Sequence, residues 1–313
     1  MNSPTPQPRK HHWADQPERG NMHLMRLTAW AARRLGRRVV APVVWGVVLY
    51  FFLSGAQARR SIAQYHDRLR ATGSSADPFA SPLSVYRQYL AFAGALLDKL
   101  DAWQGKITIH DLNVTDPDGL HAQMGTGRGQ ILVGAHLGNM EVCRALASQN
   151  ANIVLNVLVH DGNAVQFSRL MDDAGTSRLR LIQVSELDTA TMLVLSERIE
   201  QGEWLALAGD RIPLHGGRTV DVCFLGHTAP LPQGPWLLAG LLRCPVNLLF
   251  CTRHQTRFNV SMERLADGVS WTRATRATEV QRVAQAYADR LAAHCRQAPL
   301  QWFNFFPFWS HHA

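Results

Sequence analysis

The segment 131–146, ILVGAHLGNMEVCRAL, constrains the fold more than any other stretch of the chain. It opens with three apolar residues, two of them β-branched, followed by Gly134, which is typical of a short strand buried in a parallel sheet. Cys143 and Leu146 then recur at helical spacing, and Asn139 stands where a helix N-cap is expected. The segment therefore predicts a strand, a polar turn and a helix in direct succession.

The rest of the chain continues this alternation of apolar strands and amphipathic helices. Such an alternation is typical of an α/β fold, here a mixed, largely parallel sheet flanked by helices. The pattern predicts strands near 106–112, 152–159, 179–184, 204–208 and 246–252, and helices near 57–71, 82–103, 164–174, 189–201, 236–242 and 278–296. In such sheets the functional side chains gather beyond the carboxyl ends of the strands. His136, His160 with Asp161, and Asp210 with Arg211 all follow predicted strand ends.

His136 and Glu141 lie on either side of the predicted turn. A histidine is suited to removing a proton from a hydroxyl near neutral pH, and a carboxylate on its second nitrogen fixes the tautomer and stabilises the imidazolium. We therefore expect His136 to act as a general base that Glu141 orients. In the structural alternative, Glu141 only complements the helix dipole and His136 is a hydrogen-bonded loop residue.

Other classes of catalytic site find little support in the sequence. No GxSxG motif occurs, and none of the five cysteines has a recognisable histidine partner, so a covalent acyl-enzyme is not expected. The cysteines lack CxxC spacing and mostly lie in apolar runs, which favours small core residues in a reducing, cytosolic setting. A metal site built from His136, Glu141, His160 and Asp161 would lack the i, i+4 histidine pair of a helical zinc motif. We expect no metal and no cofactor.

The string HLGNME at 136–141 resembles the H-x4-D/E signature of the lysophospholipid acyltransferase superfamily, and most closely its lipid A biosynthesis acyltransferase branch. The resemblance continues in GDR at 209–211, in FLGHTAPLPQGPWLLAGLLRCPV at 224–246 and in QWFNFFPFW at 301–309. It implies a glycerolipid acyltransferase-like fold and transfer of an acyl chain from an acyl carrier protein thioester to a hydroxyl of a lipid or glycolipid. The block LPQGPW departs from the family pattern and leaves the acceptor open.

Acyl transfer also needs groups that stabilise the oxyanion and bind anionic parts of the substrates. Arg211 and Arg218 are the best candidates, because a guanidinium can hold a phosphate or carboxylate through two parallel hydrogen bonds. The resemblance implies that the block 224–246 helps to line a substrate groove, although a rigid turn between core elements is the alternative. The expected substrate-binding residues are Asn139, Asp210, Arg211, Arg218, Gly226 and Gln233.

The N-terminal part of the chain carries the basic charge. Residues 1–70 contain twelve Lys and Arg residues against three acidic residues, whereas the whole chain has a formal net charge of +8. The segment 22–38 has the pattern of an arginine-rich amphipathic helix, and 39–56 is uncharged but interrupted by Pro42. This distribution favours an anionic membrane surface over nucleic acid as a partner.

We expect residues 1–72 to form a membrane-association segment and residues 73–313 to form an acyltransferase domain at the cytoplasmic face of a bacterial inner membrane. The apolar run can be a single span, a surface-embedded hairpin or a core helix. The aromatic residues of 302–309 can seal the core or meet lipid. A non-catalytic lipid-binding module of the same fold and an acyl-thioester hydrolase are the alternatives to a transferase.

Overall fold

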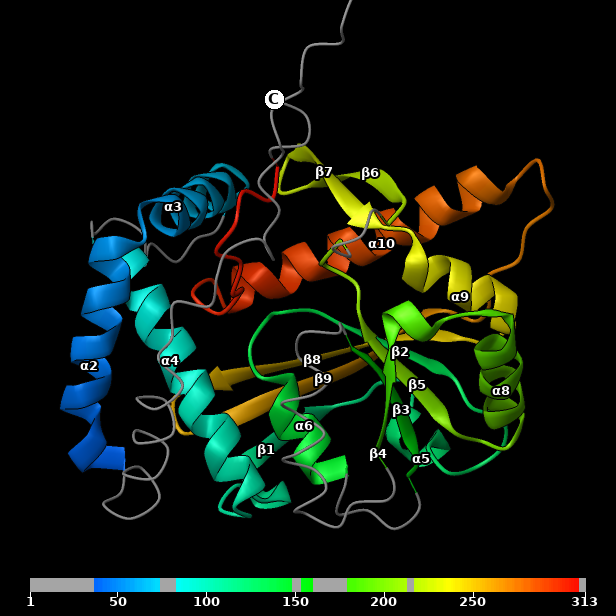
Figure 1. Cartoon of the computed structure of the whole chain (residues 1–313), viewed down its shortest axis with the longest axis horizontal. Coiled ribbons are helices and arrows are strands. Elements are labelled where there is room, and N and C mark those ends of the chain that lie inside the picture. The colour runs from blue at the N-terminus through cyan, green and yellow to red at the C-terminus, as the bar shows by residue number, and fades with distance from the viewer. Residues whose placement is uncertain (1–36, 74–82, 148–152, 160–178, 213–216, 310–313) are drawn as a thin grey trace, which may run out of the picture.

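The computed structural model describes residues 37–73, 83–147, 153–159, 179–212 and 217–309. Within them lies a seven-stranded sheet in the order β1-β9-β8-β2-β5-β3-β4 (Figure 1). Neighbouring strands run parallel, except that β8 and β9 are antiparallel. The strands of this sheet are β1 (Leu112–Thr115), β2 (Ile131–Gly134), β3 (Leu155–Val159), β4 (Leu179–Gln183), β5 (Trp204–Ala208), β8 (Val246–His254) and β9 (Arg257–Ala266). The mixed, largely parallel α/β fold is thereby confirmed.

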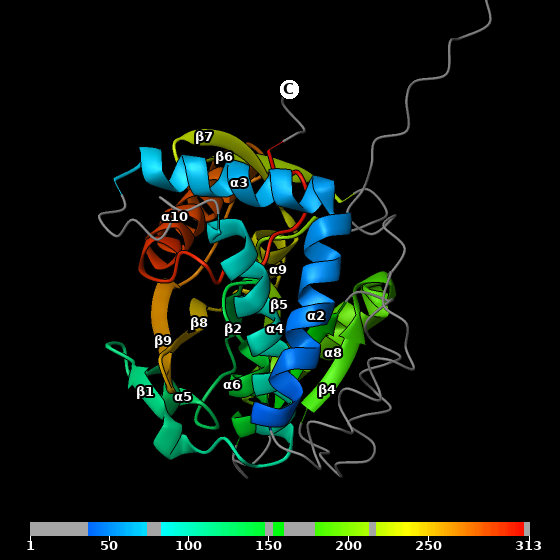
Figure 2. The ribbon, with the colours of Figure 1, turned by 90° about the vertical axis from the view of Figure 1, so that its left-hand side faces the viewer.

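Helices surround the sheet. Figure 1 shows α2, α3 and α4 together on the left, α8 and α9 on the right, and α10 running above the sheet, while Figure 2 shows α3 lying across the upper ends of α2 and α4. Helix α6 contacts both α4 and β8. The helices are α2 (Arg37–Ser54), α3 (Ala56–Ala71), α4 (Ser84–Trp103), α5 (Leu120–Gln123), α6 (Met140–Ala147), α8 (Thr189–Glu200), α9 (Gly234–Leu242) and α10 (Arg276–Gln297).

Most elements agree with the sequence-based prediction to within a few residues, but the strand expected at 106–112 is wrong. The strand begins only at Leu112, because a 3-10 turn at Ile109–Asp111 precedes it. The Asp111 carboxylate closes this turn by accepting hydrogen bonds from the Thr108 backbone N (2.8 Å) and hydroxyl (3.0 Å). The helix expected near 164–174 lies outside the described residues.

The proline-rich block forms a hairpin that the sequence analysis did not predict. Strand β6 (Thr219–Phe224) pairs antiparallel with β7 (His227–Pro232). Leu225 and Gly226 turn the chain with φ values of 49° and 77°, as a tight two-residue hairpin loop requires. Pro230 and Pro232 argue against a strand within a large sheet, but a separate two-stranded sheet tolerates them.

The C-terminal aromatic residues belong to the core. Trp302 is fully buried, and Phe308 and Trp309 are each 4% exposed. The Trp302 ring packs against Tyr65 of α3 and Phe224 of β6, with ring centroids 5.0 and 5.3 Å apart. Of the two roles left open for this segment, the structure therefore shows the core role for these three residues.

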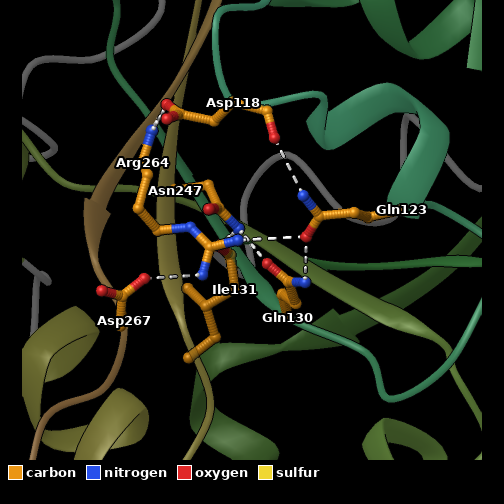
Figure 3. Close-up of polar contacts among 7 residues, drawn as sticks. All are labelled: Asp118, Gln123, Gln130, Ile131, Asn247, Arg264 and Asp267. Atoms are coloured by element: carbon orange, nitrogen blue, oxygen red, sulfur yellow. Dashed lines mark hydrogen bonds and ion pairs between the residues drawn. The ribbon is translucent and has the colours of Figure 1, made fainter.

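A polar network joins the amino-terminal ends of β2 and β8 (Figure 3). Asn247 is fully buried, and its side-chain amide donates to Gln130 Oε1 (2.9 Å) and to the Ile131 carbonyl (3.2 Å). Gln123 Oε1 accepts from Gln130 Nε2 (2.9 Å) and from Arg264 Nη2 (3.1 Å). These bonds fix the register of the central strands at one end of the sheet, so that residues at the other end keep a defined alignment.

The apolar run 39–56 lies mostly in α2, which turns by 90° into α3 at Gly55. Arg59 of α3 donates to the Leu53 carbonyl (2.8 Å) and to the Phe52 carbonyl, which satisfies the end of α2. Within the described ranges, no single helix has the length and hydropathy needed to cross a bilayer, and α2 and α3 meet that criterion only as a bent pair. Trp45, Tyr50 and Leu53 are 58, 61 and 65% exposed.

Candidate active site

The register of two central strands brings His136 and Asp210 together. Strands β2 and β5 run parallel, with Gly134 paired to Ala208. His136 and Asp210 each lie two residues beyond this pair. They consequently emerge side by side at the carboxyl ends of the strands, where α/β sheets place their functional groups.

The Asp210 carboxylate receives three hydrogen bonds. Oδ1 accepts from His136 Nδ1 (2.8 Å), and Oδ2 accepts from the His136 backbone N (2.9 Å) and from Trp302 Nε1 (3.1 Å). The Asp210 side chain is only 2% exposed, whereas that of His136 is 37% exposed. Because Nδ1 carries the proton in this arrangement, the lone pair of the neutral imidazole lies at Nε2.

Electrostatics keep this histidine neutral near pH 7. The pKa of His136 is lowered by burial and by the positive charge of Arg211. The negative charge and the hydrogen bond of Asp210 raise this pKa by less, so it stays below its usual value. Burial raises the pKa of Asp210, but the charges of His136 and Arg211 and the hydrogen bonds from His136 outweigh it and leave that pKa below its usual value. The pair is therefore a neutral imidazole beside a carboxylate, the state that a general base requires.

The loop that carries His136 is held on both sides. The Gly138 backbone N donates to the Gln301 carbonyl (2.8 Å), and the Phe303 backbone N donates to the His136 carbonyl (2.8 Å). On the other side, the Asn139 backbone N donates to the Cys251 carbonyl at 2.7 Å. The loop thus lies between the end of β8 and the C-terminal segment, and its position does not depend on a single contact.

Glu141 does not occupy the place expected of it. It lies in the first turn of α6, and its carboxylate is 3.7 Å from Lys99 Nζ of α4. The partner of His136 Nδ1 is Asp210, 74 residues away in the chain. Helix α6 begins at Met140, so Glu141 already belongs to the helix, and its carboxylate contacts Lys99 of α4 and not the imidazole. The neighbouring strand β5 aligns Asp210 with the imidazole instead. The sequence signal for Asp210 was its position two residues beyond a predicted strand, the same as that of His136.

Of the expected substrate-binding residues, Asp210 is instead the partner of His136, and Arg211 follows it directly in the chain. Its Nη2 donates to the Phe303 carbonyl (3.2 Å), and its guanidinium carbon is 5.7 Å from the centre of the Phe306 ring. Burial lowers the pKa of Arg211, and Asp210 opposes this effect. Arg211 therefore places a positive charge close to both members of the His136–Asp210 pair.

The other expected residues have structural contacts. The buried Asn139 side chain donates to the Ala95 carbonyl of α4 at 2.7 Å. Gln233 Nε2 donates to the Thr219 carbonyl (2.7 Å), and its backbone N donates to the carbonyl of the exposed Arg218 (2.9 Å). These bonds close the open end of the hairpin, while Gly226 lies at its turn.

The sequence analysis considered a metal site at His136, Glu141, His160 and Asp161 but did not expect one. His160 and Asp161 lie outside the described residues. In the described part of the chain, no group of three or more His, Cys, Asp and Glu side chains is arranged to hold a metal ion.

Residues 90–311 match the family model of the bacterial lipid A biosynthesis acyltransferases. The chain belongs to this family. The range that matches includes His136, Asp210 and Trp302. A protein from Mycolicibacterium smegmatis, named phosphatidylinositol mannoside acyltransferase, is 25% identical over 207 residues, which cover 63% of this chain and 62% of that protein. The chain thus spans less than two thirds of the length of this curated relative.

Gly138 provides a test of the loop geometry. Its φ is +70°, and a Cβ atom there would lie 1.9 Å from the Cys251 carbonyl oxygen. We expect Gly138→Ala to destabilise the protein by at least about 2 kcal/mol and to displace His136. Thermal unfolding and catalytic rate measure the two effects, with Gly268→Ala as the control, since a Cβ at Gly268 meets no atom within 4 Å. A Gly138→Ala variant that behaves like this control contradicts the close packing of the loop.

Proposed function

We propose that this chain transfers an acyl group from a thioester donor to a hydroxyl of a lipid or glycolipid, with His136 as the general base and Asp210 as the residue that orients it. The observation that supports this proposal is the hydrogen bond between His136 Nδ1 and the buried Asp210 carboxylate, on an imidazole side chain that is 37% exposed. This arrangement suits removal of a proton from a hydroxyl.

The proposed reaction proceeds by direct attack. His136 Nε2 removes the proton of the acceptor hydroxyl while its oxygen attacks the thioester carbonyl, giving a tetrahedral intermediate and an imidazolium. The C–S bond then breaks, and the departing thiolate takes the proton from the imidazolium. The Asp210 carboxylate stabilises the imidazolium between the two steps, and a positioned base of this kind typically contributes about 10²- to 10⁴-fold in rate.

Arg211 is the residue proposed to stabilise negative charge in this reaction. Its charge already lowers the pKa of His136, so it acts on the same small region in which the oxyanion would form. Arg218 is exposed and is proposed only as a contact for anionic groups of the substrates.

The nature of the two substrates is a separate proposal. An acyl carrier protein thioester as the donor rests on the resemblance of the HLGNME and GDR segments to the family. A glycolipid hydroxyl as the acceptor is supported by the family match and by the name of the mycobacterial relative.

Product analysis tests the reaction type. Full-length protein is incubated with an acyl carrier protein that bears a deuterated acyl chain and with extracted bacterial lipids, and the products are identified by mass spectrometry. An oxygen ester of a lipid that carries the label, formed as the thioester is consumed, supports a transferase. Labelled free fatty acid alone indicates a hydrolase, and an unconsumed thioester indicates a lipid-binding module.

Substitutions of the two candidate orienting residues should separate their roles. His136→Ala should lower kcat at least a hundredfold, because the base is lost, and Asp210→Asn should lower kcat severalfold to a hundredfold, because the imidazolium loses its counter-charge. Glu141→Gln should change kcat by less than about threefold, since its carboxylate faces Lys99. Initial rates and melting temperatures are measured together. A larger loss of kcat in Glu141→Gln than in Asp210→Asn, at equal stability, contradicts the assignment.

The dependence of kcat/KM on pH gives an independent test. His136 must be neutral to act, so activity should be lost as pH falls through its lowered pKa, below the usual value of about 6.5. Arg211→Gln removes a charge that lowers this pKa and should move the acidic limb to higher pH, whereas Arg211→Lys keeps the charge and should leave it in place. Asp210→Asn should move the limb to lower pH. Identical acidic limbs in all four proteins would show that another group controls the rate.

We further propose that helix α2 attaches the protein to the cytoplasmic face of a bacterial inner membrane. The proposal is supported by the exposed apolar side chains of α2 and by the basic composition of residues 1–70. Because Tyr65 and Leu69 of α3 belong to the main hydrophobic core, deletion of residues 1–72 would also damage the fold. Point substitutions in α2 are therefore the better test.

Replacing Trp45, Leu49 and Leu53 together by Ser should weaken binding to vesicles of anionic phospholipid at least tenfold, because each side chain is 46–65% exposed and would lose apolar contact with lipid. The matched control replaces Leu193 of α8 and Leu241 of α9, which are 69 and 65% exposed, by Ser. Flotation with vesicles measures the bound fraction. Equal flotation of the α2 variant and the control variant excludes α2 as the attachment site.

A further inference from the structure

Trp302 differs from the other buried tryptophans of the described residues. Its indole Nε1 donates to Asp210 Oδ2 at 3.1 Å. By contrast, the buried Nε1 atoms of Trp204, Trp236 and Trp309 have no hydrogen-bond partner. The core therefore accepts an indole ring without a partner elsewhere, whereas at Trp302 the ring nitrogen contacts the residue that holds His136.

Two helices that are remote from the site in sequence fix the position of Trp302. The side chain of Gln88 in α4 is fully buried, and its Nε2 donates to the Trp302 carbonyl at 2.8 Å. The Gln88 Oε1 in turn lies 2.6 Å from Nε2 of the buried His66 in α3. Burial is the main cause that lowers the pKa of His66 to about 4, so this ring stays neutral near pH 7 and can donate to Gln88.

We propose that Trp302 is a positioning residue for the proposed base, whose indole N–H holds Oδ2 of Asp210 so that Oδ1 stays directed at His136 Nδ1. A carboxylate can rotate about its Cβ–Cγ bond, and each donor on a separate oxygen restricts that rotation. Trp302 also links Asp210 to α4 and α3. Its indole donates to Asp210, and its carbonyl accepts from Gln88 of α4, which in turn contacts His66 of α3. The consequence for catalysis rests on the function proposed above, whereas the consequence for the His136 titration does not.

The charged and titratable groups around the pair are few among the described residues. Arg211 follows Asp210 directly and acts on both its neighbours. Tyr287 and Cys295 of α10 face Asp210, and burial raises the pKa of both, so they remain neutral at physiological pH. Lys99 of α4 and Glu141 of α6 contact each other. Among these groups, Asp210 is the one that the Trp302 indole contacts.

The test compares Trp302→Phe with Trp236→Phe in the full-length protein. Both substitutions remove a fully buried indole, but only the first removes a hydrogen bond. The His136 ring is titrated by NMR, with its signal assigned by its loss in His136→Gln. Without the indole N–H to hold Oδ2, Asp210 should be directed less firmly at the imidazole and should stabilise the imidazolium less, so the pKa of His136 should fall by about half a unit in Trp302→Phe. It should not change in Trp236→Phe.

Kinetics provide the second readout. Trp302→Phe should lower kcat roughly tenfold with little change in KM, and should move the acidic limb of kcat/KM to lower pH, in the same direction as Asp210→Asn. If the phenylalanine variant does not fold, site-specific replacement of Trp302 by 3-benzothienylalanine keeps the ring shape and removes the N–H. An unchanged His136 titration in the folded variant, or a loss of rate equal to that of Trp236→Phe, overturns the proposal. Failure of the wild-type protein to transfer acyl groups overturns the proposed function instead, while the NMR shift still supports the role of Trp302.

Discussion

The arrangement of the site depends on one buried carboxylate. Asp210 is almost inaccessible to solvent, and it is bound by the ring and backbone of His136 and by the indole of Trp302. A buried carboxylate without such partners would be protonated or would destabilise the fold. The same three hydrogen bonds that make its burial tolerable also fix the tautomer and direction of the histidine. Stability and the proposed chemistry therefore rest on the same atoms.

The ends of β2 and β5 and the C-terminal segment meet at this carboxylate. The β2–β5 register aligns His136 with Asp210, and the polar network around Asn247 secures the other end of β2. The C-terminal segment holds the histidine loop through Gln301 and Phe303, and α4 holds that segment through Gln88. Helix α2, which is proposed to meet the membrane, packs on α4, so the proposed attachment and the proposed site share one scaffold.

Much of this fold could be predicted from the sequence, because apolar strands and amphipathic helices have distinct periods. The position of His136 at a strand end followed from the local pattern in the same way. Its acidic partner did not, since the spacing of HLGNME makes Glu141 a near neighbour in sequence, whereas the pairing of β2 with β5 selects Asp210. The β6–β7 hairpin was missed because its prolines are unfavourable in ordinary strands. The turn at Ile109–Asp111 was missed because two hydrogen bonds to the Asp111 carboxylate override an alternating pattern.

Asp210 is proposed to act through His136. The most direct measurement is kcat/KM for His136→Ala, Asp210→Asn and the double variant under one set of conditions. If the two residues work as a unit, kcat/KM of the double variant should equal that of His136→Ala within about twofold, because Asp210 has no further catalytic role once the imidazole is gone. If the losses of the two single variants multiply in the double variant, Asp210 acts independently of His136, which contradicts the proposed pair.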